Sequence, residues 1–246
     1  MRLSGKTAIV TGGASGFGAG IVKKFIAEGA TVMIADINGD AAQAMADETG
    51  GIACTVDVAN SDSVKAMAEA ATAKMGHIDI LVNNAGITHL PTPMEDVSED
   101  EFDRVLAVNA KSVFLTAKHI VPHMKSRRTG AILNVASTAG VSPRPRLNWY
   151  NASKGWMITA TKAMAVELAP DGVRVNAINP VAGETPLLKS FMGEDTPEIR
   201  AKFISTIPIG RFSTPEDMGN AACFLCSDEA SMVTGVAMEV DGGRCI

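Results

Sequence analysis

Tyr150 and Lys154 stand four residues apart, a spacing that places both side chains on one face of a helix. A tyrosine with its ordinary pKa of about 10 is almost fully protonated at neutral pH, so it is a poor base unless a nearby positive charge favours the phenolate. Lys154 can supply that charge. The pair therefore predicts a proton-transfer site, although a half-buried tyrosine beside a solvated lysine would give the same pattern.

The N-terminal part of the chain shows a strand, a glycine-rich turn and a helix in succession. The apolar run 7–10 predicts the strand, Thr11–Gly18 is the turn, and apolar residues at helical spacing follow from Ile21 to Ile26. Glycines allow the backbone to approach a pyrophosphate closely, and a helix start offers free N–H groups and a positive dipole end. We therefore expect a dinucleotide site at this turn.

Asp36 follows a second buried strand, 31–35, about twenty residues beyond the glycine-rich turn. A carboxylate there would accept hydrogen bonds from the adenosine ribose and would repel a 2′-phosphate. Asp36 therefore predicts NAD as the cofactor rather than NADP. The alternative is a solvated turn aspartate ahead of Asn38-Gly39.

Strand and helix patterns alternate along the whole chain. Further strands are expected at 52–56, 78–82, 131–135, 173–178 and 236–240, and helices at 40–48, 61–75, 98–124, 149–168 and from residue 214 onward. This alternation predicts an α/β fold of the Rossmann type, in which a doubly wound, seven-stranded parallel sheet is flanked by helices. No linker divides residues 1–246, so we expect a single domain. The irregular stretch 185–210 is expected to form a mobile cover over a ligand.

Composition excludes several classes of partner. The net charge of −5 and the pI near 5.4 argue against a nucleic-acid partner, which would require clustered basic charge. No apolar run approaches the ~20 residues that span a bilayer, and no signal-type segment opens the chain. We expect a soluble cytoplasmic protein without a nucleic-acid or membrane partner.

The cysteines and histidines do not predict a disulfide framework or a metal site. The four cysteines are scattered, and Cys223 and Cys226 form a C-x-x-C pair without a second pair, which favours buried small hydrophobic residues. His119 and His123 share a predicted helix face but lack a third ligand in sequence. We expect no metal.

Taken together and in order, the motifs of this chain resemble the classical short-chain dehydrogenase/reductases. The resemblance spans nearly all 246 residues and rests on the Thr-Gly-x-x-x-Gly-x-Gly turn, Asp57-Val58, Asn83-Asn84-Ala85-Gly86, Val108-Asn109, Ser137, and Tyr150 with Lys154. It implies a catalytic set of Asn109, Ser137, Tyr150 and Lys154. It implies cofactor contacts by Thr11, Gly12, Ser15, Gly16, Phe17, Gly18, Asp36, Asp57, Val58, Asn84, Ala85, Gly86, Tyr150, Lys154, Pro180, Gly183 and Thr185.

The resemblance also assigns roles to these residues. Asp57 would bind the adenine, Asn109 would position a water that relays protons to Lys154, and Ser137 would hold the substrate oxygen as negative charge develops on it. The chain departs from the family pattern at Val181, which replaces the usual glycine after Pro180 and puts the starting angle of the cover in doubt. The family usually forms tetramers, so a homotetramer is expected, with helices 98–124 and 149–168 at one interface and the last strand at another.

The implied activity is an NAD-dependent oxidoreductase that interconverts a small-molecule alcohol and its carbonyl. The first alternative is a 3-oxoacyl-(acyl-carrier-protein) reductase, which would usually prefer NADPH and need a basic surface near the cleft. Asp36 argues against the first requirement, while Lys125, Arg127 and Arg128 partly meet the second and Asp171 weakens it. The second alternative is a non-catalytic dinucleotide sensor, which would have no physical need for the complete catalytic set.

Arg144 and Arg146 belong to the run Pro143-Arg144-Pro145-Arg146, in the segment that leads from Ser137 to Tyr150. In the family this segment lines one wall of the substrate cleft. A guanidinium fork suits a carboxylate, sulfonate or phosphate, so both arginines are candidate substrate-binding residues for an anionic substrate. The alternative is that one or both point to solvent or pair with an acidic residue across a subunit interface.

Overall fold

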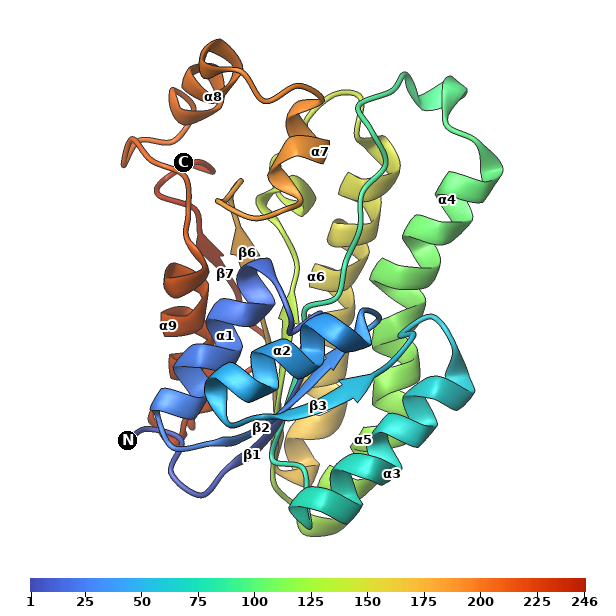
Figure 1. Cartoon of the computed structure of the whole chain (residues 1–246), viewed down its shortest axis with the longest axis vertical. Coiled ribbons are helices and arrows are strands. Elements are labelled where there is room, and N and C mark those ends of the chain that lie inside the picture. The colour runs from blue at the N-terminus through green and yellow to red at the C-terminus, as the bar shows by residue number, and fades with distance from the viewer.

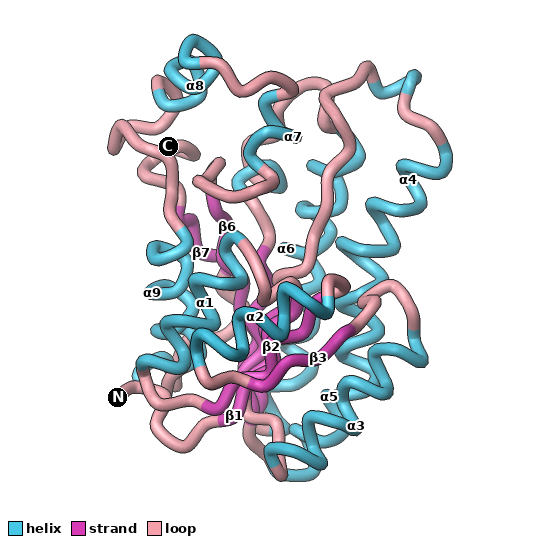
Figure 2. Tube along the Cα trace, viewed as in Figure 1, coloured by secondary structure: helices cyan, strands magenta, loops and turns pink.

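Seven parallel strands cross the centre of the molecule in the order β3-β2-β1-β4-β5-β6-β7 (Figures 1 and 2). The structure is a computed structural model that describes residues 1–246. The strands are β1 Thr7–Thr11, β2 Thr31–Asp36, β3 Ile52–Thr55, β4 Ile80–Asn83, β5 Gly130–Val135, β6 Val173–Pro180 and β7 Ala237–Val240. The predicted seven-stranded parallel sheet of the Rossmann type is confirmed.

Helices cover both faces of this sheet because each crossover between parallel strands returns over a face. They are α1 Gly16–Ala27, α2 Gly39–Thr49, α3 Ser61–Met75, α4 Glu99–Leu106, α5 Ser112–Arg127, α6 Asn148–Leu168, α7 Leu188–Met192, α8 Pro197–Ile204 and α9 Pro215–Cys226. Buried side chains of α1, α2 and α9 form one apolar layer, and those of α3, α5 and α6 form the other. None of the helices is both long and apolar enough to span a membrane.

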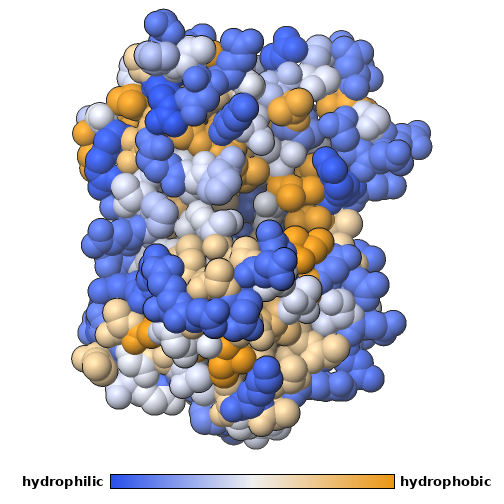
Figure 3. All heavy atoms as spheres, in the orientation of Figure 1, coloured by the Kyte–Doolittle hydropathy of each residue, from blue (hydrophilic) through white to orange (hydrophobic).

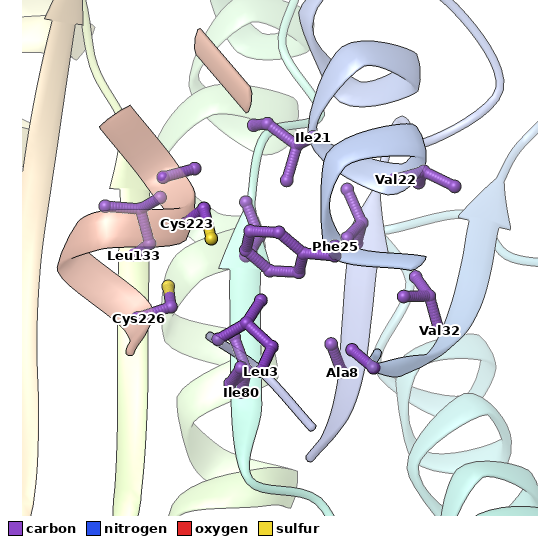
Figure 4. Close-up of a cluster of buried hydrophobic side chains, with 14 of the residues drawn as sticks. Leu3, Ala8, Ile21, Val22, Phe25, Val32, Ile80, Leu133, Cys223 and Cys226 are labelled. Atoms are coloured by element: carbon purple, nitrogen blue, oxygen red, sulfur yellow. The ribbon is translucent and has the colours of Figure 1, made fainter. Parts of the chain in front are cut away.

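Phe25 fills the layer between α1 and α9, where it points toward Cys223, Cys226 and Leu3 (Figure 4). All four side chains are almost completely buried, and both cysteines are free thiols. Burial raises the pKa of the Cys226 thiol to about 12, so this thiol stays protonated. The C-x-x-C pair therefore packs as small hydrophobic residues, as its helical position predicted.

A polar network inside the core links the strands to the helices that carry the site. Asn83 of β4 donates a 2.9 Å hydrogen bond to Asn134 of β5, and Asn134 donates another of 2.9 Å to Thr161 of α6. Thr116 of α5 donates to Asn83 at 2.8 Å. Since buried polar groups are costly unless they are paired, this network fixes how α5 and α6 lie on the sheet.

The long helix expected over 98–124 is present, but a π-helical turn interrupts its α-helical pattern. Ser98 caps α4 by accepting a hydrogen bond from the Glu101 amide, but a π-helical turn at Ala107–Lys111 separates α4 from α5. A π turn inserts an extra residue into the helix, and the hydrophobic pattern gives no sign of it. The turn contains Asn109.

The stretch expected to be irregular, 185–210, contains the two short helices α7 and α8 above the carboxyl ends of the strands (Figure 2). Its apolar side chains gather with Val181 into a small core of their own, formed by Val181, Leu188, Met192, Ile207 and Phe212. The segment is therefore a packed cover. Its helices are too short for a clear hydrophobic period in the sequence.

Candidate active site

A cleft of about 460 Å³ lies at the carboxyl ends of the strands, between the glycine-rich turn and the cover. The strand order reverses between β1 and β4, and an open α/β sheet leaves a crevice at such a point. The space-filling view shows this side of the molecule hollowed near its middle, with hydrophobic residues beside the hollow (Figure 3). The cleft therefore lies where a doubly wound sheet is expected to bind a ligand.

Most residues predicted from the sequence line this cleft. The lining includes Gly12, Ser15, Gly16, Phe17, Asp36, Asp57, Val58, Asn84, Ala85, Gly86, Ser137, Arg144, Tyr150, Lys154, Pro180, Gly183 and Thr185. Thr11, Gly18, Asn109 and Arg146 were predicted to contact ligands but are not part of the lining. The first three support the wall from behind, and Arg146 is exposed.

Thr11 and Gly18 shape the dinucleotide end of the cleft without lining it. The Thr11 hydroxyl accepts hydrogen bonds of 3.1 Å from the amides of Asn84 and Ala85, which ties β1 to the loop after β4. A Cβ on Gly18 would lie 2.0 Å from the Gly12 carbonyl oxygen, so only glycine fits there. Thr11 and Gly18 therefore hold the wall in place, and their predicted contacts with a cofactor stay a prediction.

The start of α1 fits a phosphate group. The side chain of Ser15, the residue that precedes the helix, makes no capping hydrogen bond, so the amides of the first turn are left to a ligand. Gly12, with a φ of 60°, turns the chain toward this helix start. The arrangement can bind a dinucleotide pyrophosphate.

Asp36 lies at the end of β2 and faces the same end of the cleft. One carboxylate oxygen accepts a 3.1 Å hydrogen bond from the Ala14 amide in the glycine-rich turn, and the other accepts one of 3.0 Å from the Asn38 amide. Both bonds hold the carboxylate in place, and each oxygen keeps capacity for a further donor. Asp57 lines this end as well and accepts a bond from the Ala59 amide at 2.9 Å.

At the other end of the cleft, Ser137, Tyr150 and Lys154 meet. Ser137 follows β5, where its hydroxyl accepts a 3.0 Å hydrogen bond from the Ala139 amide and lies close to the Tyr150 hydroxyl. Tyr150 and Lys154 are buried on one face of α6, and Lys154 Nζ lies 5.8 Å from the centroid of the Tyr150 ring. The spacing in the sequence predicted this shared face.

Burial dominates the pKa values of this pair in the protein without a cofactor. It raises the pKa of Tyr150 to about 12, with the nearby Ser137 hydroxyl acting in the opposite direction, and lowers the pKa of Lys154 to about 8. Lys154 by itself does not bring the tyrosine pKa down in this state, and the lower pKa expected from Lys154 joined to a second positive group stays a prediction. The charged form of each group is penalised, so a further positive charge in the cleft is needed to favour the phenolate.

Asn109 is fully buried behind the catalytic wall. Its side-chain amide accepts a 2.9 Å hydrogen bond from the Ile87 amide and donates bonds to the Ile87 carbonyl oxygen at 2.9 Å and to Ser153 Oγ at 3.0 Å. The side chain thus ties α6 to the loop after β4. No side-chain hydrogen bond joins Asn109 directly to Lys154, so its role in a proton relay stays a prediction.

Val181 stands where the family usually has a glycine, and Gly183 lies two residues further along the chain. Val181 is buried beneath the cover, where a glycine would leave its apolar core unfilled. Gly183 takes the position of close approach, since a Cβ there would lie 2.4 Å from the Phe17 ring. The substitution therefore anchors the cover.

Sequence reasoning missed several lining residues, of which three have side chains suited to contact a substrate. Phe191 of α7 lies beside Tyr150 with ring centroids 5.1 Å apart, Phe203 of α8 stands across from Arg144, and Asn151 follows Tyr150 directly. The two aromatic residues lie in a stretch without a helical period. Their presence among polar neighbours was the only signal that could have found them.

The residues expected not to bind a metal have other contacts. His119 Nε2 pairs with Ser61 Oγ at 3.1 Å, and His123 Nε2 accepts a hydrogen bond from the Ile78 amide at 3.3 Å. No group of three His, Cys, Asp or Glu side chains gathers where a metal ion could bind.

Comparison with known proteins places these features in one family. Residues 12–244 match the family model described as enoyl-(acyl carrier protein) reductase. The chain is 50% identical over 254 residues to 4-formylbenzenesulfonate dehydrogenase TsaC1/TsaC2 of Comamonas testosteroni, with all of both chains covered. It is 41% identical over 252 residues to the 3-oxoacyl-[acyl-carrier-protein] reductase FabG of Thermotoga maritima, again with all of both chains covered.

A solved structure of a related reductase has the same fold as this chain. The 3-ketoacyl-(acyl-carrier-protein) reductase from Brucella melitensis complexed with NADH is 49% identical and superposes with a TM-score of 0.95, covering 99% of this chain and 100% of that one. The chain therefore belongs to the short-chain dehydrogenase/reductase family and is an oxidoreductase that uses a nicotinamide dinucleotide.

Proposed function

We propose that this protein interconverts an alcohol and its carbonyl with NAD(H), and that Tyr150 is the general acid and base. The observation that supports this most strongly is the meeting of Ser137, Tyr150 and Lys154 at one end of a cleft whose other end suits a dinucleotide. A non-catalytic sensor would need the dinucleotide end alone.

Each residue has a distinct role in the proposed oxidation. The substrate hydroxyl gives its proton to Tyr150, and the Ser137 hydroxyl donates a hydrogen bond to the same oxygen in the reduction direction, when negative charge grows on it. An oxidised nicotinamide held in the cleft would supply the hydride acceptor and a positive charge near Tyr150. Lys154 adds a second positive charge, so that the two together offset the burial that holds the tyrosine pKa at about 12.

We propose NAD rather than NADP because Asp36 faces the ribose end of the cleft. Its carboxylate would accept hydrogen bonds from the ribose hydroxyls and would repel a 2′-phosphate. A relative that is 38% identical over 246 residues is named 2-dehydro-3-deoxy-L-rhamnonate dehydrogenase (NAD(+)). The Brucella structure in complex with NADH also supports NAD as the cofactor.

The alternative is a 3-oxoacyl-carrier reductase, which the names of the Thermotoga and Brucella relatives support. The basic surface predicted for such a partner does not lie near the cleft, so that expectation is wrong. Lys125 and Arg127 end α5 at the edge of the sheet where β5 begins, while the cleft lies where β5 ends. Lys125 also pairs with Asp171, and Arg127 with Asp79. We therefore propose a free small-molecule substrate.

The test is an assay of the purified protein with alcohols and NAD, and with aldehydes, ketones and a 3-oxoacyl thioester in the presence of NADH, followed by the absorbance of the reduced cofactor. The panel should contain 4-formylbenzenesulfonate, after the relative named for it. We expect turnover of a free alcohol or carbonyl. Turnover of the acyl thioester alone would favour the carrier reductase, and binding of NAD without any turnover would favour the sensor.

A further inference from the structure

Among the partly buried arginines of this chain, Arg144 alone has no acceptor for its guanidinium. Arg2, Arg127, Arg200 and Arg211 each pair with a carboxylate, and the guanidinium of Arg174 donates to three backbone carbonyl oxygens. No carboxylate lies within 4 Å of the Arg144 guanidinium, and its nitrogens make no hydrogen bond within the chain. A half-buried guanidinium in this state is costly unless a partner is supplied.

The position of Arg144 is fixed by two contacts. Its carbonyl oxygen accepts a 2.7 Å hydrogen bond from Asn151 Nδ2, which holds the segment against the residue that follows Tyr150. Its guanidinium lies 4.3 Å from the centroid of the Phe203 ring on α8, a distance suited to a cation–π contact. The flat group is therefore held against the cover while its edge remains open to the cleft.

Charge is distributed unevenly along the cleft. Its acidic lining residues, Asp36 and Asp57, both lie at the ribose end, whereas Arg144 and Lys154 are the charged residues at the other end. Lys154 is occupied by a 2.8 Å hydrogen bond to the Val135 carbonyl oxygen. Arg144 is thus the cation at this end that has no partner.

A second arginine stands behind the same segment. Arg244 donates a 3.3 Å hydrogen bond to Ser142 Oγ, two residues before Arg144, and its Nε is buried without a partner. Burial, and to a smaller extent the proximity of Arg244, lowers the pKa of Arg144. Two positive groups therefore meet here without a carboxylate to balance them, which favours a bound anion.

We propose that Arg144, held on the Phe203 ring, binds a carboxylate or sulfonate group of the substrate at the end remote from the reacting carbon. Phe191 and Phe203 line the cleft near Tyr150 and Arg144, so an apolar, flat spacer suits the space between the two polar ends. The substrate class is an alcohol or carbonyl compound with an aromatic spacer and an oxyanion. This inference rests on the proposed function only in placing the reacting carbon at Tyr150.

Arg146 supplies the matched control. It belongs to the same Pro-Arg-Pro-Arg run but is exposed, does not line the cleft, and contacts the Pro91 carbonyl oxygen at 3.5 Å. Replacing it removes the same charge from the same segment. An effect that depends on overall charge would follow either substitution, whereas an effect of the proposed contact follows Arg144 alone.

The experiment measures binding by calorimetry to the NADH-loaded protein, with benzenesulfonate and the neutral benzenesulfonamide as probes. We expect the parent to bind the sulfonate about tenfold or more tightly than the sulfonamide. Arg144→Gln should weaken sulfonate binding about 10- to 100-fold and leave sulfonamide binding within about twofold, since a hydrogen bond to a charged group is worth roughly this factor. Arg144→Lys should retain part of the preference, and Arg146→Gln should retain all of it.

Two results would overturn the proposal. The first is a parent without preference for the sulfonate. The second is an Arg144→Gln variant whose affinity for both probes falls equally, because Arg144 would then only hold the cover. Phe203→Leu is the control for that outcome, because it loosens the contact between the cover and Arg144 and leaves the guanidinium in place. The probes do not react, so this binding test is separate from turnover. A parent that oxidises neutral alcohols but does not prefer the sulfonate contradicts the anion site alone. A parent that binds the sulfonate through Arg144 but oxidises no alcohol contradicts the proposed function alone.

Discussion

Lys154 donates a 2.8 Å hydrogen bond from its Nζ to the carbonyl oxygen of Val135, the last residue of β5. This bond joins α6 to the strand that leads into Ser137, so it fixes the lysine beside the tyrosine. The acceptor is neutral and the ammonium is buried, so no carboxylate compensates the charge. The cost of holding this charge is a testable property of the folded protein.

Lys154→Met is expected to raise the free energy of unfolding near pH 7 by roughly 1–3 kcal/mol, the cost of burying the ammonium less one lost hydrogen bond. The pKa of Lys154 falls from 10.5 to about 8 on folding, so below pH 8 the lysine is charged in both states and the native state carries the full cost. Between pH 8 and 10.5 only the unfolded state binds the proton, so the stability of the parent rises.

Urea unfolding of both proteins at several pH values measures this difference. The stability advantage of the Met variant over the parent should shrink from pH 8 to pH 10.5. The titration of Tyr150 contributes equally to the stability of both proteins, so it should cancel in the difference. A Met variant that is less stable than the parent at pH 7 would contradict the account.

The fold could be predicted from the sequence because most of its signals are local. Alternating buried strands and amphipathic helices have clear periods, and the motifs mark the carboxyl ends of β1, β2 and β4. The π turn that holds Asn109 could not be predicted, because it shifts one residue without changing composition or hydrophobic pattern. The cover has helices too short to show a period.

The site residues could be predicted where the residue type and its spacing determine the chemistry. Properties of the site that depend on three-dimensional packing could not be predicted. Tyr150 and Lys154 share a helix face by spacing alone, but the effect of burial on their pKa values depends on what surrounds them. Arg144 and Arg146 look equivalent in the sequence. Only the fold shows that Arg144 turns to the cleft while Arg146 stays exposed.

Asp36→Ala is expected to narrow the preference for NAD over NADP. The parent should favour NAD in kcat/KM by a few kcal/mol, about 100-fold or more, from ribose hydrogen bonds and phosphate repulsion combined. Initial rates with both cofactors measure the ratio. Asp57→Asn is a matched control at the same end of the cleft and should keep the preference, while equal kcat/KM for both cofactors in the parent would refute the role of Asp36.

Asn109→Leu should destabilise the protein by about 2–4 kcal/mol, because it removes three hydrogen bonds and leaves both backbone groups of Ile87 without their partner. Ser153→Ala removes one of these bonds and the 2.7 Å bond that Ser153 Oγ donates to the Tyr150 carbonyl oxygen, and it should cost about 1–2 kcal/mol. Chemical denaturation of the two variants gives the comparison. Equal costs would show that the bonds to Ile87 do not matter.

A homotetramer is expected to use the outer faces of α5 and α6, where Phe114 and Trp156 are about half exposed and Val166 is 79% exposed. Large apolar side chains gathered on neighbouring helices favour burial against another copy of the chain. Light scattering should give a tetramer for the parent and a smaller species for Phe114→Glu. Ile37→Glu, at an exposed apolar position in the cleft lining beside Asp36, should leave the assembly unchanged, and a monomeric parent would contradict the expectation.

The most direct test of the proposed function is a single-turnover measurement of hydride transfer in the parent and in Tyr150→Phe, with NAD binding measured in parallel. The account predicts that the variant loses about 10²- to 10⁴-fold in rate, the usual contribution of a general acid or base, and binds NAD within about twofold of the parent. A variant that transfers hydride at more than about half of the parent rate would contradict the assignment of Tyr150 as the acid and base.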